Sequence, residues 1–274
     1  MDATTSPVVR LEALGRRFGD QVALSGVSAT IAPGEFVAVV GRSGAGKTTL
    51  LRCLSRSVVA TDGAVHIGER DVKSLRGAPL RAHRASVGVV YQQFNLVKRL
   101  RVLDNVLVGR LSHLRGLSRL TALAGRFGAA DRDIGLRCLD HVGLLSRAWQ
   151  RTDTLSGGEQ QRVAIAKILA QAPSLILGDE PVASLDVANG AMVMAMLRRV
   201  ASETGLTVIT TLHQVDYART YADRVLGLRA GRLVFDGPAA SLTGAALASI
   251  FGEPPATQAR REPPDLAQVE LVAG

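Results

Sequence analysis

The sequence of 274 residues has few aromatic side chains and almost no cysteine. Aromatic residues make up only 4% of the chain, so alanine, valine, leucine and isoleucine must build the core. The two cysteines, Cys53 and Cys138, cannot form a disulfide scaffold, and neither has the spacing of a metal ligand. The scattered histidines His66, His83, His113 and His141 likewise predict no metal site. A reduced, intracellular compartment is therefore expected.

Long apolar runs are also missing. The longest uncharged apolar stretch lies around Val187 to Leu197, well short of the roughly 18 residues that a membrane span needs. The first 13 residues contain no apolar segment of the kind that signal peptides carry. We therefore expect a soluble protein without a signal peptide.

Positive charge is abundant, although only four of the 33 basic residues are lysine. The formal net charge of +9 favours acidic partners, such as a nucleotide, a nucleic acid or an anionic membrane surface. No run of five basic residues occurs, and neither RNP-like nor C₂H₂ spacing accompanies the charge. We therefore expect no nucleic-acid partner.

Short β-rich runs alternate with helical segments along the chain. Strands are predicted at 8–11, 27–31, 35–40, 64–67, 86–91, 174–178, 207–211 and 224–228, and turns at Pro33-Gly34, Asp62-Gly63 and Ala230-Gly231. Helical spacing dominates from about Leu100 to Arg151 and predicts a helical subdomain within about 95–155. We expect Trp149 to pack within it. Strand, helix and strand in succession predict an α/β fold with a mainly parallel sheet. We expect a single domain over 1–252 and a loose tail over 253–274, which is rich in proline and charge.

The strongest local signal follows the apolar strand predicted at 35–40. Its residues match the pattern G-x-x-x-x-G-K-[ST] in full: Gly41, Arg42, Ser43, Gly44, Ala45, Gly46, Lys47 and Thr48, followed by Thr49. The glycines let consecutive backbone N–H groups and the next helix N-terminus point at phosphate oxygens. Lys47 can reach the β- and γ-phosphates, and the Thr48 hydroxyl can bind Mg²⁺. This loop predicts a binding site for a nucleoside triphosphate.

A second acidic element is needed near such a loop, and the run Leu175 to Glu180 supplies it. An apolar strand ends there in two adjacent carboxylates. Asp179 is predicted to bind Mg²⁺, and Glu180 to polarise the attacking water.

The string Leu155-Ser-Gly-Gly-Glu-Gln-Gln-Arg162 precedes a predicted helix. Ser156 and Glu159 have the spacing of a capping box, which alone indicates only a well-capped helix. The whole string, however, matches the signature motif of ABC-type ATPases. The chain resembles an ABC transporter nucleotide-binding subunit from about residue 8 to 240, with every expected motif in order.

This resemblance implies the fold of a P-loop NTPase, with an N-terminal antiparallel β-subdomain, a mainly parallel core sheet and a helical subdomain. It implies that Phe18 stacks on adenine, where the family more often has tyrosine. It also implies that Gln92 contacts Mg²⁺ and the permease, that Ser184 to Asp186 form the D-loop and that His213 contacts the γ-phosphate. Lys47, Gln92, Glu180 and His213 would then be catalytic, and Mg²⁺ would be held by Thr48, Gln92 and Asp179.

The same resemblance implies a head-to-tail homodimer. Ser156, Gly157 and Gly158 of one copy would bind the ATP held by the P-loop of the other. Partner permease subunits would connect the dimer to an external substrate-binding protein. The chain would then lie peripherally on the cytoplasmic face of the cell membrane.

The stretch Tyr91 to Leu100, the run Leu212 to Asp216 and the long helical block resemble the phosphonate-import ATPases. We therefore expect the ATPase subunit of a phosphonate importer. An importer for another oxyanion or for amino acids remains the main alternative, because the substrate never touches this subunit. An ABC ATPase without a membrane partner is a further alternative, although such proteins usually have two cassettes or a coiled-coil insertion. Intact Lys47, Asp179, Glu180 and His213 argue against a regulatory module without catalysis.

Overall fold

A computed structural model describes residues 8–252 of the chain. Its larger sheet has six strands in the order β10-β9-β3-β8-β7-β6. They are β3 (Phe36–Val40), β6 (Val87–Tyr91), β7 (Leu175–Asp179), β8 (Thr207–Leu212), β9 (Arg224–Arg229) and β10 (Arg232–Pro238). All neighbours run parallel except β9 and β10, which form an antiparallel hairpin. The predicted α/β class with a mainly parallel sheet is confirmed.

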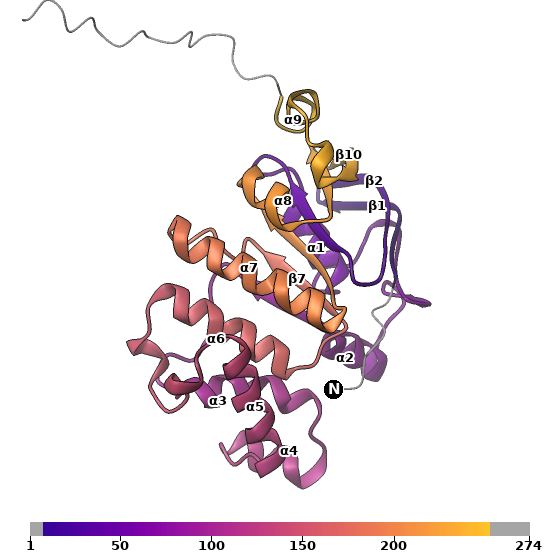
Figure 1. The fold of residues 1–274 in the computed structure, drawn as a ribbon. Helices are drawn as coiled ribbons and strands as arrows, with labels where there is room; N and C mark the ends of the chain where they lie inside the picture. Colours follow the sequence, from indigo (N-terminus) through magenta and orange to yellow (C-terminus); the bar gives the residue numbers. More distant parts are fainter. Residues whose placement is uncertain (1–7, 253–274) are drawn as a thin grey trace, which may run out of the picture.

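A second sheet is fully antiparallel and has the order β2-β1-β4-β5. Its strands are β1 (Val9–Phe18), β2 (Gln21–Ile31), β4 (Asp62–Ile67) and β5 (Arg70–Asp71). Figure 1 shows β1 and β2, in indigo, on the opposite side of the molecule from α3, α4 and α5. The N-terminal antiparallel part of the expected fold is therefore present.

Nine α-helices and four short 3₁₀ helices occur within the described residues. The α-helices are α1 (Lys47–Leu54), α2 (Gly77–Ser86), α3 (Val102–Leu107), α4 (Gly116–Leu123), α5 (Ala129–His141), α6 (Gly157–Ala170), α7 (Val187–Thr204), α8 (Val215–Tyr221) and α9 (Gly244–Phe251). The 3₁₀ helices are η1 (Val108–Ser112), η2 (Leu145–Arg147), η3 (Thr152–Thr154) and η4 (Ala239–Ser241). No helix within 8–252 has the length and hydropathy that crossing a membrane requires.

Strand β3 is buried along its whole length because both faces of the sheet are covered. Phe36, Ala38 and Val40 enter the apolar cluster shared with α3, α5, α6 and α7. Val37 and Val39 enter the cluster shared with α1 and the antiparallel sheet. The continuous apolar run at 35–40 predicts this double burial. The loop that follows Val40 is therefore held by a rigid strand.

Two local expectations are wrong. Asp62-Gly63 is not a turn but the start of β4, where the pairing with β1 shifts register. Gly63 has φ +67°, and a Cβ atom there would lie 2.2 Å from the Glu12 carbonyl oxygen, so glycine marks a bulge and a close approach. Trp149, which we expected to pack within the helical subdomain, is 61% exposed.

The other turn predictions agree with the structure. Ala230 and Gly231 have φ values of 48° and 77°, and they join the paired residues Arg229 and Arg232. Two positive φ values suit the twist of a two-residue hairpin turn. The expected tail over 253–274 lies outside the described residues.

Candidate active site

The glycine-rich loop joins β3 to α1, which begins at Lys47. Gly44 and Gly46 have φ values of 78° and 103°. A Cβ atom at Gly46 would lie 2.5 Å from the Ala23 carbonyl oxygen of β2. The left-handed φ and the close backbone contact both require glycine here. The loop therefore curls tightly at the helix N-terminus, where free N–H groups can receive an anion.

Lys47 is only 5% exposed although it carries a charge. Its Nζ donates hydrogen bonds to the carbonyl oxygens of Gly41 at 2.9 Å and Arg42 at 3.2 Å. Burial lowers the pKa of Lys47, and the nearby charges of Glu180 and Asp179 oppose that shift. The loop's own carbonyl groups thus hold the ammonium group at the site.

Oxygen atoms suited to Mg²⁺ gather where β7 ends. The Thr48 hydroxyl donates to Asp179 Oδ1 at 3.0 Å, and the Thr211 hydroxyl lies 3.3 Å from the same atom. Asp179 and Thr211 are register partners on β7 and β8. A carboxylate and hydroxyl groups are the hard oxygen ligands that Mg²⁺ prefers, so these residues fit that ion.

Glu180 is held in a strained backbone conformation directly after β7, with φ 53°. Its N–H donates to the Thr211 hydroxyl at 2.9 Å. Its Oε1 lies 2.5 Å from Nε2 of His213, which follows β8. The Glu180 side chain is 20% exposed and that of His213 45% exposed, so solvent or substrate can reach the pair.

A pocket of about 290 Å³ joins these elements. Its lining includes Phe18, Val22, residues 43–49 and Glu180. Phe18 is 41% exposed, and the Arg16 guanidinium lies 4.3 Å from the centre of its ring. The structure thus brings the predicted P-loop, Phe18 and Glu180 together around one pocket.

Gln92 and the signature residues lie elsewhere. Gln92, Phe94, Gly157 and Ser184 line a separate groove of about 680 Å³. Gln92 comes one residue after Tyr91, which pairs in register with Asp179. It therefore follows the same carboxyl edge of the sheet without lining the P-loop pocket.

Ser156 caps α6 with the predicted capping box. The Ser156 Oγ accepts from the Glu159 N–H at 3.3 Å, and the Ser156 N–H donates to Glu159 Oε2 at 2.9 Å. This bond from the Ser156 backbone holds the pKa of Glu159 below its usual value. A Cβ atom on Gly158 would lie 2.6 Å from Asn189 Oδ1, so the signature packs tightly against α7.

Thr211 was not predicted as a site residue from the sequence. Its hydroxyl oxygen accepts from the Glu180 N–H, and its hydroxyl donates to Asp179 Oδ1. A polar residue at the end of a buried strand, two positions before His213, is the signal that could have found it. Cys53 and Cys138 are buried and unpaired, as expected of small core residues. Burial raises the pKa of each thiol to about 11.

A P-loop at the end of a buried parallel strand, with two adjacent carboxylates at the end of a nearby strand, defines a P-loop nucleoside triphosphatase. The ABC transporter family model matches residues 24–183. The chain belongs to the ABC transporter family and is an ATP-hydrolysing ATP-binding subunit.

Its curated relatives include two that are called phosphonates import ATP-binding protein PhnC. The one from Agrobacterium fabrum is 47% identical over 244 residues, covering 88% of this chain and 84% of the relative. The one from Nocardia farcinica is 49% identical over 250 residues, covering 91% of this chain and 92% of the relative. Within its family, the chain therefore resembles the ATP-binding subunits of phosphonate importers.

Solved structures agree on the fold. One is an ATP-binding cassette described as a dimer in a post-hydrolysis state with ADP and Pi, with a TM-score of 0.72 and 32% identity. The match covers 84% of this chain and 98% of that one. Another belongs to an ABC transporter complex of Clostridium perfringens, with a TM-score of 0.76, 25% identity and coverages of 86% and 90%.

Proposed function

We propose that this chain is the ATP-hydrolysing subunit of a phosphonate importer, bound peripherally at the cytoplasmic face of the cell membrane. The observation that carries the activity is the pocket in which the P-loop, Phe18 and Glu180 meet. The substrate class rests on the relatives at 47% and 49% identity that are named for phosphonate import. The nucleotide-binding domain would span 1–252, with its helical subdomain at about 95–155.

The P-loop and the residues that end or follow β6, β7 and β8 would each perform one part of hydrolysis. The loop N–H groups and Lys47 hold the phosphates, and Thr48, Asp179 and Gln92 would bind Mg²⁺. When bound, Mg²⁺ neutralises charge on the phosphate oxygens. Glu180 accepts a proton from the attacking water, and His213 positions Glu180 and contacts the γ-phosphate.

The signature residues complete the site of a second copy. Ser156 and its neighbours do not line the P-loop pocket of their own chain. The Ser156 hydroxyl, whose Oγ accepts from the Glu159 N–H, would be the donor that contacts the partner's phosphate. A head-to-tail homodimer would bring this donor to the partner's ATP, and a relative in fold is described as dimeric.

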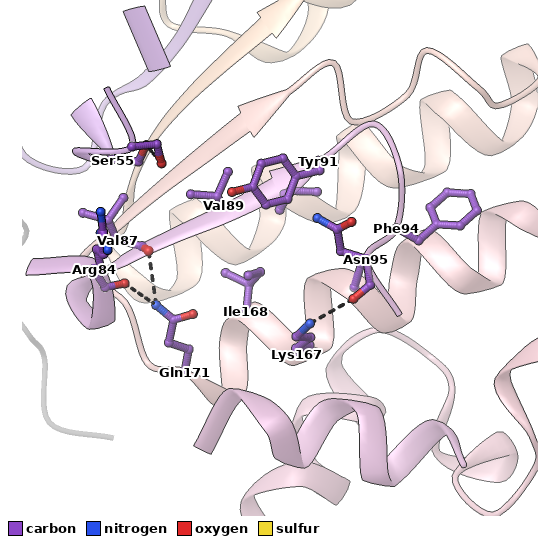
Figure 2. A pocket seen from close by; sticks show the side chains of 13 residues that line it. Ser55, Arg84, Val87, Val89, Tyr91, Phe94, Asn95, Lys167, Ile168 and Gln171 are labelled. Carbon is purple, nitrogen blue, oxygen red and sulfur yellow. Dashed lines mark hydrogen bonds between the residues drawn. The ribbon is translucent and has the colours of Figure 1, made fainter. Parts of the chain in front are cut away.

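A permease segment would dock between β6 and α6. Figure 2 shows this groove of about 300 Å³, with Val89 and Tyr91 from the edge strand and Ile168 from α6 in its lining. Phe94 lines this groove and also the groove beside the signature. Leu96, in contrast, packs against the core cluster. Of these two residues, Phe94 is therefore the one that is available to a partner.

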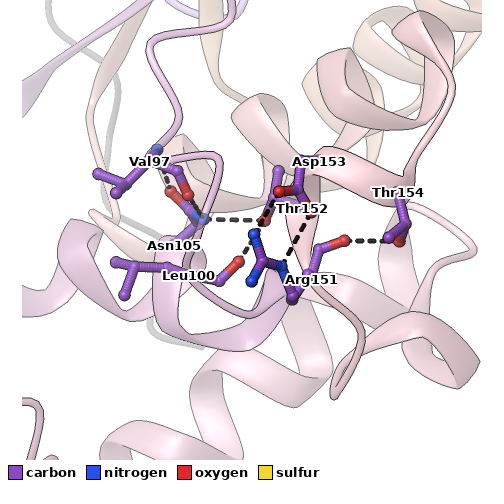
Figure 3. Close-up of polar contacts among 7 residues, drawn as sticks. All are labelled: Val97, Leu100, Asn105, Arg151, Thr152, Asp153 and Thr154. Atoms are coloured by element: carbon purple, nitrogen blue, oxygen red, sulfur yellow. Dashed lines mark hydrogen bonds and ion pairs between the residues drawn. The ribbon is translucent and has the colours of Figure 1, made fainter.

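Asn105 connects the docking segment, residues 92–100, to Thr152, which precedes the signature (Figure 3). Its amide exchanges two hydrogen bonds with the Val97 backbone, at 2.8 and 3.0 Å, and donates to the Thr152 hydroxyl at 2.9 Å. The Thr152 hydroxyl donates to the Leu100 carbonyl at 3.0 Å. Thr152 stands four residues before Ser156. Motion imposed on the docking segment would therefore reach the signature through a buried, fully bonded amide.

The test is ATP hydrolysis by the chain reconstituted with its permease and substrate-binding protein. We expect methylphosphonate to stimulate hydrolysis several-fold, while sulfate and an amino acid do not. The same complex with Glu180→Gln serves as the control without hydrolysis. Stimulation by sulfate or an amino acid and not by the phosphonate would overturn the substrate assignment.

A further inference from the structure

The positive charge of the chain is concentrated in one part of the sequence. Between Val72 and Ala130 stand eleven lysine or arginine residues and a single acid, Asp104. This surplus of ten positive charges compares with a net charge of +9 for the entire chain. Among the described residues, Arg110 alone of these eleven forms an ion pair with a carboxylate, that of Asp131. The other ten basic side chains are therefore not neutralised by a carboxylate ion pair.

Helix α4 lies within this segment and exposes three leucines. Leu117, Leu120 and Leu123 are 76%, 65% and 65% exposed. Their spacing of three places them along one side of the helix. Ala122 is the buried residue of α4, so the helix is anchored through its opposite side. Figure 1 shows α4 at the far end of the helical part, away from β1 and β2.

Basic side chains surround this leucine face. Arg115 precedes α4, Arg119 lies within it and Arg126 follows it, and all three are exposed. Apolar residues on one side of a helix with arginines beside them are typical of helices that lie in a membrane interface. Anionic headgroups attract such arginines, and the acyl boundary receives the leucines.

The position of α4 agrees with this partner. The segment before it is fixed to the C-terminal end of α6: Arg110 donates to the Ala170 carbonyl at 3.1 Å, and His113 Nε2 lies 2.7 Å from the Gln171 carbonyl oxygen. Gln171 also lines the groove between β6 and α6, where Figure 2 shows it. Helix α4 therefore continues from the rim of the surface that faces the permease, and hence the bilayer.

We propose that the leucine face of α4, with Arg115, Arg119 and Arg126, binds the surface of an anionic lipid bilayer beside the permease. This inference rests on the proposed peripheral location but not on the transported substrate. This contact would give the subunit an affinity for the membrane, and that affinity would not depend on the permease.

The test is flotation of the purified full chain with vesicles that contain no permease. Vesicles of equal parts phosphatidylglycerol and phosphatidylcholine should carry the chain to the top of the gradient, and vesicles of phosphatidylcholine alone should not. Raising the salt concentration should weaken the binding, because counterions screen exposed charges. The combined variant Leu117→Ser, Leu120→Ser, Leu123→Ser should bind at least tenfold more weakly. The variant Arg119→Ala should bind about fivefold more weakly.

Two matched controls keep the result specific to α4. Val234→Ser removes an exposed apolar side chain of β10, and Arg232→Ala removes an exposed arginine of the same strand. Both should bind vesicles as the parent does, and all variants should keep the parent's basal ATPase rate and melting temperature.

Equal binding to both kinds of vesicle, or unchanged binding by the leucine variant, would overturn the proposal. A leucine variant that binds vesicles normally but loses affinity for the detergent-solubilised permease would assign α4 to the permease instead. A leucine variant that binds vesicles normally but changes its oligomeric state would assign α4 to a second copy. Because these vesicles contain neither permease nor substrate, failure here leaves the importer test unaffected, and the reverse also holds.

Discussion

The imidazole of His213 and the carboxylate of Glu180 meet at 2.5 Å, from the ends of two adjacent strands, β8 and β7. Glu180 reaches this position with φ 53° and with its N–H bonded to Thr211. We expect the γ-phosphate of bound ATP to offer the imidazole a second, more highly charged partner. The carboxylate would then become available to the attacking water.

The variant Glu180→Gln should bind ATP as tightly as the parent but lower kcat by about 10²- to 10⁴-fold, because an amide cannot accept the proton of water. Steady-state hydrolysis and equilibrium binding of a fluorescent ATP analogue measure the two effects. Glu203→Gln, at an exposed site on α7, is the matched control and should hydrolyse normally. Parental kcat in Glu180→Gln would mean that another residue is the base.

The variant Lys47→Ala should lose both tight ATP binding and turnover. The P-loop holds no other lysine, and phosphate charge needs a cation at this place. Isothermal titration with ATP measures the loss. Lys73→Ala should bind ATP normally, because the Lys73 Nζ donates to the Thr61 carbonyl at the surface. Normal hydrolysis by Lys47→Ala would contradict the P-loop assignment.

The variants Phe94→Ser and Leu96→Ser should separate docking from packing. Phe94 lines the two grooves, so its replacement should change stability by less than about 1 kcal/mol yet weaken binding to the permease at least tenfold. Leu96 packs on the core, so its replacement should cost about 2 kcal/mol. Urea unfolding and co-purification with the permease give the two readouts. Full uptake in cells by Phe94→Ser would refute the docking role.

Stability should decrease as the pH falls below about 6.5, in part because of His83. This ring is 2% exposed, and its Nε2 lies 2.9 Å from the Leu54 carbonyl oxygen. Burial lowers the pKa of His83 from the ordinary value of 6.5. The unfolded chain therefore binds the proton more readily, and the stabilisation present above pH 6.5 is lost as the pH falls through the folded-state pKa.

Urea midpoints at pH 7.5 and at pH 5 measure this dependence. His83→Gln keeps a donor for the Leu54 carbonyl and should show a smaller decrease between the two pH values. His141→Gln, at an exposed position on α5, should behave as the parent does. An unchanged decrease in His83→Gln would contradict the role of this histidine.

The P-loop was predictable because its chemistry is local: a buried strand, glycines at fixed spacing and a lysine at the helix start. The carboxylates at the end of β7 were predictable for the same reason. Thr211 was not, because its role depends on the register between β7 and β8, which no local pattern specifies. The turn predicted at Asp62-Gly63 failed because the same residue types also form bulges, and pairing with β1 decides between the two. The prediction for Trp149 failed because helical spacing alone does not indicate which helix faces pack against other elements.

Two copies of the chain should close around ATP, with each signature completing the site of the other. Light scattering of Glu180→Gln in the presence of ATP and Mg²⁺ measures this association. We expect a particle of twice the chain mass of 28.9 kDa with ATP, and a single chain with ADP. Adding Ser156→Arg to the same protein should abolish the ATP-dependent dimer. A particle of 28.9 kDa in ATP, or a dimer unaffected by Ser156→Arg, would contradict the shared site.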